Sequence, residues 1–138
     1  MERLSPLTDQ SMQIKAIHHI AIICSDYGQS KHFYVDILGA DIICETWREQ
    51  RQSYKLDLTL GNAQLELFSF PEPPPRPTRP EACGLRHLAL AVDNLDANIA
   101  HLQKHSIPVE PIRLDALTGK RFTFFQDPDG LPLELYEV

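Results

Sequence analysis

Two histidines and two glutamates recur at one spacing along this chain. His19 precedes Glu66 by 47 residues, and His87 precedes Glu134 by the same 47 residues. Imidazole and carboxylate groups together bind divalent ions such as Ni, Co, Zn, Mn and Fe, and octahedral coordination by such a set leaves positions open for water or substrate. A buried carboxylate without a partner costs several kcal/mol, a penalty that a bound cation removes. The pattern therefore predicts one divalent-metal site with these four residues as ligands.

The four residues belong to a longer internal repeat. The segment HIAI at 19–22 matches HLAL at 87–90, and LEL at 65–67 matches LEL at 133–135, both at an offset of 68 residues. Any one of these histidines or glutamates alone is explained more simply as a satisfied core residue or an exposed strand residue. Two independent matches at one offset indicate a duplicated unit, and they favour metal ligation over the simpler explanation.

The elements that must position these residues also occur twice. Apolar and alternating stretches predict strands, and each half contains one helix with an apolar stripe. Between the halves, residues 71–80 contain six prolines, which cannot pair into a sheet, so they predict a stiff connector. The order β-α-β-β-β is expected in both halves. The first helix is expected from Asp26 or Ser30 to Leu38, and the second is expected to be capped by Asp93 and to end at His105. The expected strands lie at 14–24, 41–47, 53–60, 63–70, 85–92, 109–114, 121–126 and 131–136.

The predicted organisation is a single α+β domain made of two tandem βαβββ modules. We expect residues 1–12 to form a flexible tail and residues 13–138 to form the domain, with module one at 13–70, a proline-rich linker at 71–82 and module two at 83–138. Strand alternation places each repeated histidine on a face that also carries small alanines, opposite an aliphatic face that should pack on the helices. The histidine faces are therefore expected to be the faces that form the site.

Composition excludes several classes of function. A chain of 138 residues with 43% hydrophobic residues is expected to fold as one soluble domain. The net charge of −6 argues against binding to nucleic acid or to a membrane surface. No apolar run approaches the roughly 20 residues that span a bilayer, and the first ten residues lack the apolar region of a signal peptide. The three cysteines are an odd number without a CxxC pair, which suits a reducing compartment and predicts a cytoplasmic location.

Several segments resemble a known family. The pieces HHIAI, FYVDILGAD, LELF, LRHLALAVD and FFQDPDGLPLELYE are similar to the vicinal-oxygen-chelate superfamily, and within it to glyoxalase I (lactoylglutathione lyase). The resemblance covers nearly all of residues 14–138. It implies the glyoxalase/bleomycin-resistance/dioxygenase fold, in which curled sheets enclose a metal, with His19, Glu66, His87 and Glu134 as ligands. Dioxygenase and thiol-transferase members usually lack the first glutamate, so Glu66 favours the isomerase-like branch.

The resemblance implies a metal-dependent lyase or isomerase. Its substrate would carry two adjacent oxygens, as in a hemithioacetal, and would react through an enediolate, with Glu134 as the base and Glu66 as the second candidate. The implied cofactor is one divalent ion, Ni, Zn or Co first and Mn or Fe second. Glyoxalase I binds glutathione partly through an asparagine just past the first glutamate, but residues 67–71 contain none, which leaves glutathione open as a co-substrate. Alternatives are an acyl-CoA epimerase, an extradiol-type dioxygenase or a non-catalytic binding protein.

Two further expectations concern partners. The resemblance implies a homodimer in which the first module of one chain faces the second module of the other. It also implies that the molecule bound in the site is a small substrate. Basic residues could add an anion-binding rim, although a solvated surface explains them as simply; they are Arg86, Arg113, Lys120 and Arg121. His18 should point away from His19 and pack, and Cys83 is expected near the mouth of the site.

Overall fold

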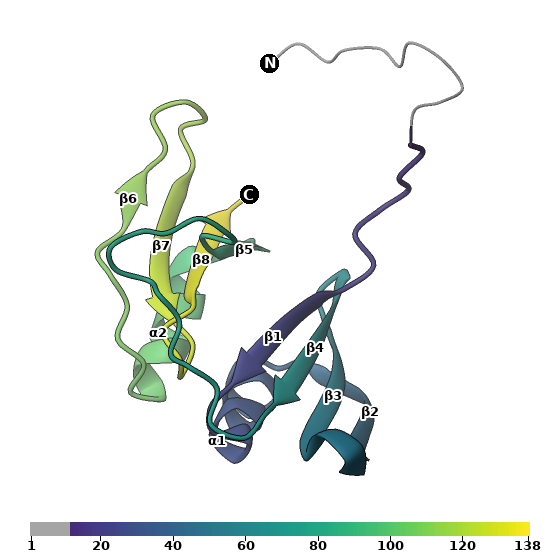
Figure 1. Ribbon diagram of the computed structural model, residues 1–138. Coiled ribbons are helices and arrows are strands. Elements are labelled where there is room, and N and C mark those ends of the chain that lie inside the picture. Colours follow the sequence, from purple (N-terminus) through teal and green to yellow (C-terminus); the bar gives the residue numbers. More distant parts are fainter. Residues whose placement is uncertain (1–11) are drawn as a thin grey trace.

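The computed structural model describes residues 12–138 and shows two modules side by side, each a four-stranded sheet with a helix on one face (Figure 1). The expected α+β fold with two βαβββ modules is confirmed. The expected tail is 1–12, and residues 1–11 of it lie outside the described residues. No helix between Met12 and Val138 is long and apolar enough to cross a membrane.

The first module begins with a strand and a helix whose start is set by Asp26. The Asp26 side chain accepts a hydrogen bond from the Gln29 backbone N–H at 3.0 Å, which caps the helix as the sequence predicts. The helix continues without a break into a π-helical segment, η1. The elements are β1 (Ile20–Cys24), α1 (Tyr27–Lys31), η1 (His32–Ile37), β2 (Asp41–Arg48), the short 3-10 helix η2 (Glu49–Arg51), β3 (Ser53–Leu60) and β4 (Ala63–Ser69).

The second module repeats this order with a longer helix. Its cap is Asn94, whose side chain accepts from the Ala97 backbone N–H at 2.9 Å, so the predicted cap at Asp93 is wrong by one residue. The elements are β5 (Leu88–Val92), α2 (Leu95–Lys104), β6 (Arg113–Leu114), β7 (Arg121–Gln126) and β8 (Pro132–Glu137).

Three strands are shorter than predicted by three residues or more, because pairing partners or backbone N–H donors are missing at their ends. β1 forms over 20–24 instead of 14–24; at the observed register, residues 14–17 have no partner because β4 begins at Ala63. β5 forms over 88–92 instead of 85–92, since its partner begins at Pro132. β6 forms only at Arg113–Leu114 instead of 109–114, because Pro108 and Pro111 have no N–H to donate to the ladder.

The two sheets have the same topology and register. Their strand orders are β1-β4-β3-β2 and β5-β8-β7-β6, and in each the first strand lies parallel to the last. Ala21 lies opposite Glu66 in one sheet, and Ala89 lies opposite Glu134 in the other. The duplication seen in the sequence is therefore a duplication of backbone structure, with both glutamates at equivalent positions.

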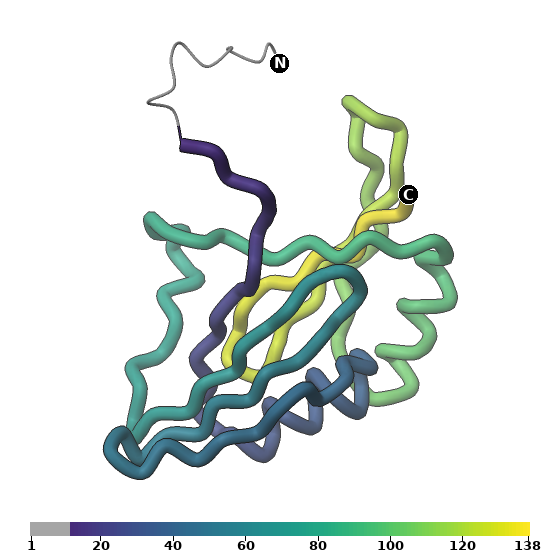
Figure 2. The backbone as a smooth tube through the Cα atoms, turned by 90° about the vertical axis from the view of Figure 1, so that its right-hand side faces the viewer, coloured from purple at the N-terminus to yellow at the C-terminus, as the bar shows by residue number. Residues whose placement is uncertain are grey.

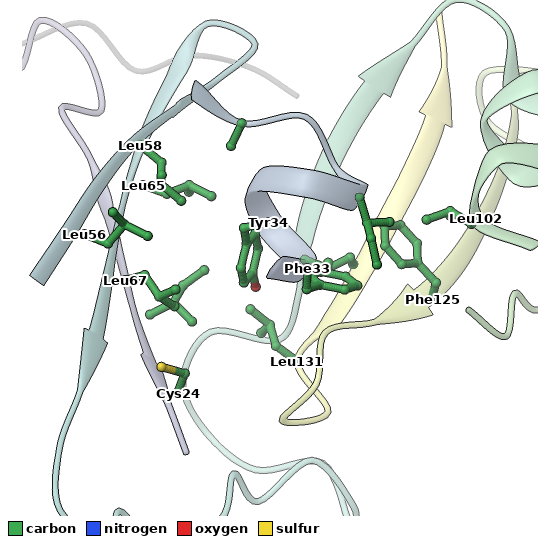
Figure 3. Close-up of a cluster of buried hydrophobic side chains, with 14 of the residues drawn as sticks. Cys24, Phe33, Tyr34, Leu56, Leu58, Leu65, Leu67, Leu102, Phe125 and Leu131 are labelled. Atoms are coloured by element: carbon green, nitrogen blue, oxygen red, sulfur yellow. The ribbon is translucent and has the colours of Figure 1, made fainter. Parts of the chain in front are cut away.

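The core lies between the modules, on the aliphatic faces of both sheets. Figure 3 shows Phe33 and Tyr34 between leucines of the first sheet and Phe125 of the second. The Phe33 and Phe125 ring centroids are 6.3 Å apart. Because the aliphatic faces turn inward to this shared core, the opposite faces, which carry the histidines and glutamates, turn outward.

Hydrogen bonds from the turn at 127–130 hold module two on module one. The Tyr34 hydroxyl donates to the buried Asp127 carboxylate at 2.7 Å, and Asp129 accepts from the Ser25 backbone N–H at 3.1 Å and from the Ser25 hydroxyl. Burial raises the pKa of Tyr34, so its hydroxyl stays protonated as a donor. The acidic turn therefore delivers the strand that carries Glu134 and also fixes that strand to the other module.

Removal of one hydroxyl tests this connection. Tyr34→Phe should lower the free energy of unfolding by about 1–3 kcal/mol, because Asp127 loses a buried donor. Urea denaturation of purified protein measures the change. Tyr54→Phe is the matched control, because Tyr54 is exposed and should change stability by less than about 0.5 kcal/mol. Equal stability of Tyr34→Phe and wild type would show that the hydrogen bond is not what holds the modules.

The linker between β4 and β5 lies along the outward face of the second sheet. In Figures 1 and 2 it runs on the opposite side of that sheet from α2. Thr78 donates from its hydroxyl to the Gly130 carbonyl at 3.1 Å, and Arg76 donates to the Leu85 and Arg86 carbonyls at 2.6 and 3.1 Å. These contacts fix the segment that leads directly into His87.

Candidate metal centre

His19 and Glu66 form a pair on the outward face of the first sheet. His19 directly precedes β1, two residues before Ala21, which lies opposite Glu66 in β4. Strand alternation therefore brings both side chains to one face, and His19 Nε2 lies 3.5 Å from Glu66 Oε2. The Glu66 side chain is largely buried and that of His19 is partly exposed.

His87 and Glu134 form the equivalent pair on the second sheet. His87 Nε2 lies 3.3 Å from Glu134 Oε1, and the His87 ring meets Phe124 edge-on with centroids 5.1 Å apart. His87 Nδ1 is buried and has no hydrogen-bond partner among residues 12–138. A buried nitrogen in that state is costly and calls for a ligand or a partner group.

Each pair has the donor types and the separation that two ligands of one metal ion need. Ligands bound at about 2.0–2.2 Å lie about 2.8–3.6 Å apart at octahedral or tetrahedral angles, and the two pairs are at 3.5 and 3.3 Å. One imidazole nitrogen and one carboxylate oxygen from each half form the mixed set that borderline divalent metals accept. The residues present therefore fit a metal ion.

One chain does not bring the two pairs together. Within the described part of the chain, no group of three His, Cys, Asp or Glu side chains lies close enough to hold a metal ion. The reason is the packing of the modules, whose aliphatic faces share a core and whose histidine faces turn outward. A single chain thus presents two separate His–Glu pairs.

The surroundings of the two glutamates differ. Beside Glu66, Lys55 Nζ lies 3.8 Å from Glu66 Oε1 and 2.7 Å from Asp57 Oδ1. The hydrogen bond to Asp57 raises the pKa of Lys55, so the ammonium is kept charged. Sequence reasoning missed Lys55 and Asp57, although their alternate positions in the strand at 53–60 put them on one face. In the second sheet Phe124 occupies the position opposite Glu134, where the first sheet has Asp57 opposite Glu66.

Other candidate residues divide between the pocket and the surface. Arg86, Arg113 and Cys83 line the pocket above His87 and Glu134. Arg121 does not, because it bridges Glu137 and Asp96, both at 2.9 Å. The hydrogen bond from Arg121 holds the pKa of Glu137 below its usual range.

Two histidines lie outside the pairs and have other contacts. His18 is exposed instead of packed as expected, and its Nδ1 lies 2.9 Å from His19 Nδ1. His101, in α2, contacts the Ile37 carbonyl through Nε2 at 2.7 Å. Neither histidine adds a third member to a His–Glu pair.

Comparison with known proteins places this chain in a family. Residues 16–135 match the Glyoxalase/Bleomycin resistance protein/Dioxygenase superfamily. The chain belongs to this superfamily. The match covers both modules and therefore includes both His–Glu pairs.

Similar members of the superfamily come from bacteria. The chain is 65% identical to the uncharacterized protein YwkD of Bacillus subtilis (91% of this chain, 99% of YwkD) and 62% identical to the uncharacterized protein YaeR of Escherichia coli (90% and 97%). Among solved structures, a glyoxalase family protein from Enterococcus faecalis has 50% identity and a TM-score of 0.85, covering 91% of this chain and all of that one.

More distant relatives have enzyme names. The chain is 29% identical to a 2-epi-5-epi-valiolone epimerase of Actinomyces (89% of this chain, 79% of the relative) and 27% identical to human mitochondrial methylmalonyl-CoA epimerase (98% and 81%). It is also 27% identical to metallothiol transferase FosB of Staphylococcus epidermidis (91% and 83%). An enzymatic role is therefore in keeping with the superfamily, whose members include several kinds of enzyme.

Proposed function

We propose that the protein is a metal-dependent lyase or isomerase of the glyoxalase I type, acting on a small substrate with two adjacent oxygens. The observation that carries this proposal is the repeated pair of His19 with Glu66 and His87 with Glu134, at 3.5 and 3.3 Å on equivalent strands. A purely structural ion pair has no need to be repeated at the same register in both modules. Two pairs that each supply half of one metal centre must both be present, one in each module.

The proposed centre is completed by a second copy of the chain. Since the pairs turn outward from the shared core, His19 and Glu66 of one chain would face His87 and Glu134 of another, in a two-fold homodimer. Two features support such an assembly. The strands β1 and β5 are edge strands with one unpaired side in their sheets, and unpaired edges favour association. Ile17 and Ile23, which flank the His19 face, are also exposed.

The four side chains would hold one divalent ion. When bound, that ion supplies Lewis-acid polarisation of two adjacent substrate oxygens. Glu134 removes a proton from the substrate carbon beside the carbonyl: the C–H bond breaks, its electron pair moves toward the carbonyl oxygen, and the proton stays on the carboxylate until it returns to the neighbouring carbon. Glu66 holds the opposite side of the site, next to Lys55.

A second candidate function is epimerisation next to a carbonyl. The observation that favours it is the similarity to two epimerases, at 29% and 27% identity. This reaction begins with the same proton removal and differs in the face to which the proton returns. The same residues would therefore serve both reactions, and a substrate screen separates them.

Metal analysis of the purified protein tests the proposal. We expect one divalent ion per chain in the wild type. In His87→Ala, the affinity for that ion should be lower by about 10- to 100-fold or more, because a ligand is lost. His32→Ala, which removes an exposed histidine in η1, is the matched control and should keep the ion. Protein that is folded and active but binds no divalent ion would overturn the proposal. A substrate screen over hemithioacetals, acyl-CoA epimers and catechols then distinguishes the chemistries.

A further inference from the structure

A pocket of about 720 Å³ lies above His87 and Glu134. One wall is the linker segment 76–86, and the other is formed by strands β6 and β7. Its volume falls in the range of small-molecule binding sites. The pocket therefore contains one of the two half-sites and has space for a substrate beside Glu134.

Arginines are concentrated around this pocket. Four of its 18 lining residues are arginines, which is half of the eight arginines in the chain, and no lysine is among them. Three glutamates also line it, so the formal charge of the lining is 4 − 3 = +1, in a chain whose net charge is −6. One of those glutamates is Glu134, the proposed metal ligand. Positive charge in a concave surface attracts and retains anions.

The arginines are not all neutralised by protein carboxylates. Arg86 forms two bonds with Glu81 at 2.9 and 3.1 Å, and Arg113 forms one ion pair with Glu110 at 3.0 Å. Arg76 donates only to neutral oxygens, and Arg79 forms no ion pair with any residue between 12 and 138. The guanidinium groups of Arg76 and Arg79 therefore have no protein carboxylate within ion-pair distance among these residues.

An apolar surface lies next to these charges. The Arg113 guanidinium carbon lies 5.4 Å from the Phe122 ring centroid and 5.2 Å from that of Phe124, so the cation is held over the two rings. Phe124 in turn contacts the His87 ring. A ligand that reaches Glu134 would have its carbon skeleton against these rings and its charged end near the arginines.

The two modules differ in the residues beside their glutamates. Phe122 and Phe124 lie opposite Tyr136 and Glu134, whereas the equivalent positions opposite Phe68 and Glu66 hold Lys55 and Asp57. Module one also has an arginine over two rings, Arg48 over Phe68 and Phe70 at 4.7 and 5.6 Å, but these rings do not lie opposite its glutamate. The sheet itself therefore does not require an aromatic ring opposite the glutamate, and of the two modules only the second has one.

We infer that this pocket binds the anionic end of the substrate, and that the substrate is a small organic acid, a carboxylate or phosphate-type oxyanion with an apolar or planar body. Arginine is suited to this role because its planar guanidinium binds both kinds of oxyanion through paired hydrogen bonds. The inference rests on the proposed function for the placement of the reacting carbon beside Glu134. Its test needs neither turnover nor a known substrate.

Isothermal titration of the full-length protein with simple probes tests the inference. The probes are benzoate and phenyl phosphate, which carry both features, benzyl alcohol, which lacks the charge, and inorganic phosphate, which lacks the body. We expect one of the two aromatic anions to bind at least tenfold more tightly than benzyl alcohol and than inorganic phosphate, and the stronger of them identifies the oxyanion. The double variant Arg79→Gln/Arg113→Gln should weaken that binding at least tenfold.

The control removes the same charge elsewhere. Arg51→Gln/Lys104→Gln changes two exposed cations outside the pocket and should leave probe affinity within twofold of wild type. Equal affinity for benzyl alcohol, or equal weakening by both double variants, would overturn the inference. Metal content measured in the same samples gives an independent answer, since loss of the proposed metal site would leave the dependence on Arg79 and Arg113 intact.

Discussion

Glu134→Gln should lower turnover by about 10²–10⁴-fold, because a positioned general base contributes a rate factor of that size. Glutamine keeps an oxygen that can bind a metal but cannot take up a proton. Glu134 is preferred over Glu66 as the base because it lines the pocket of about 720 Å³ in which a substrate fits, whereas Glu66 is not part of that pocket and its Oε1 lies 3.8 Å from Lys55 Nζ. Glu66→Gln should therefore affect metal binding more than proton transfer.

The comparison is made at matched metal occupancy, with the substrate that the screen identifies. Exchange of the substrate C–H proton with deuterated water, followed by NMR, reports proton removal separately from later steps. Glu134→Gln should abolish exchange, while Glu66→Gln should retain it. The reverse pattern would exchange the roles of the two glutamates. Exchange at wild-type rates in both variants would mean that proton abstraction by a ligand carboxylate is not the mechanism.

The duplicated fold could be predicted from the sequence because it depends on local patterns. The alternation of apolar and polar residues predicted the first and last residues of β3 and β7 correctly. The offset of 68 residues predicted that Glu66 and Glu134 occupy equivalent positions in the two sheets, as they do. Strand ends were predicted less well, because the length of β1 depends on where β4 begins, and that is a property of pairing.

The candidate site could be predicted only as two halves. Spacing identifies which residues share a face, and it correctly paired His19 with Glu66 and His87 with Glu134. It does not say how two modules pack on each other. That packing is set by side chains such as Phe33 and Phe125, whose contact turns the aliphatic faces inward. The arginine-lined pocket was predicted only in part, because the possible anion-binding rim included Arg86 and Arg113 but not Arg76 and Arg79 of the linker. Linker and sheet meet only in the folded chain.

Two variants that each lack one half-site should restore metal binding when combined in one dimer. His19→Ala/Glu66→Ala removes the pair of module one, and His87→Ala/Glu134→Ala removes the pair of module two. Each variant alone should bind no divalent ion, because every site in its dimer lacks two ligands. In a heterodimer, the intact module one of one chain faces the intact module two of the other, which makes one complete site. The two mutated modules face each other in the second site, which therefore has none of the four metal-binding side chains.

The stoichiometry makes this test quantitative. A heterodimer purified through two different affinity tags should hold half the metal of the wild-type dimer, and a freely exchanged equal mixture about a quarter, because about half of its dimers are mixed. Light scattering confirms that both variants remain dimeric, and circular dichroism confirms that they fold. If the four ligands came from one chain, no combination would bind metal. A heterodimer without metal, formed from two folded variants, would therefore overturn the shared site, whereas half-occupancy would require that the ligands come from both chains.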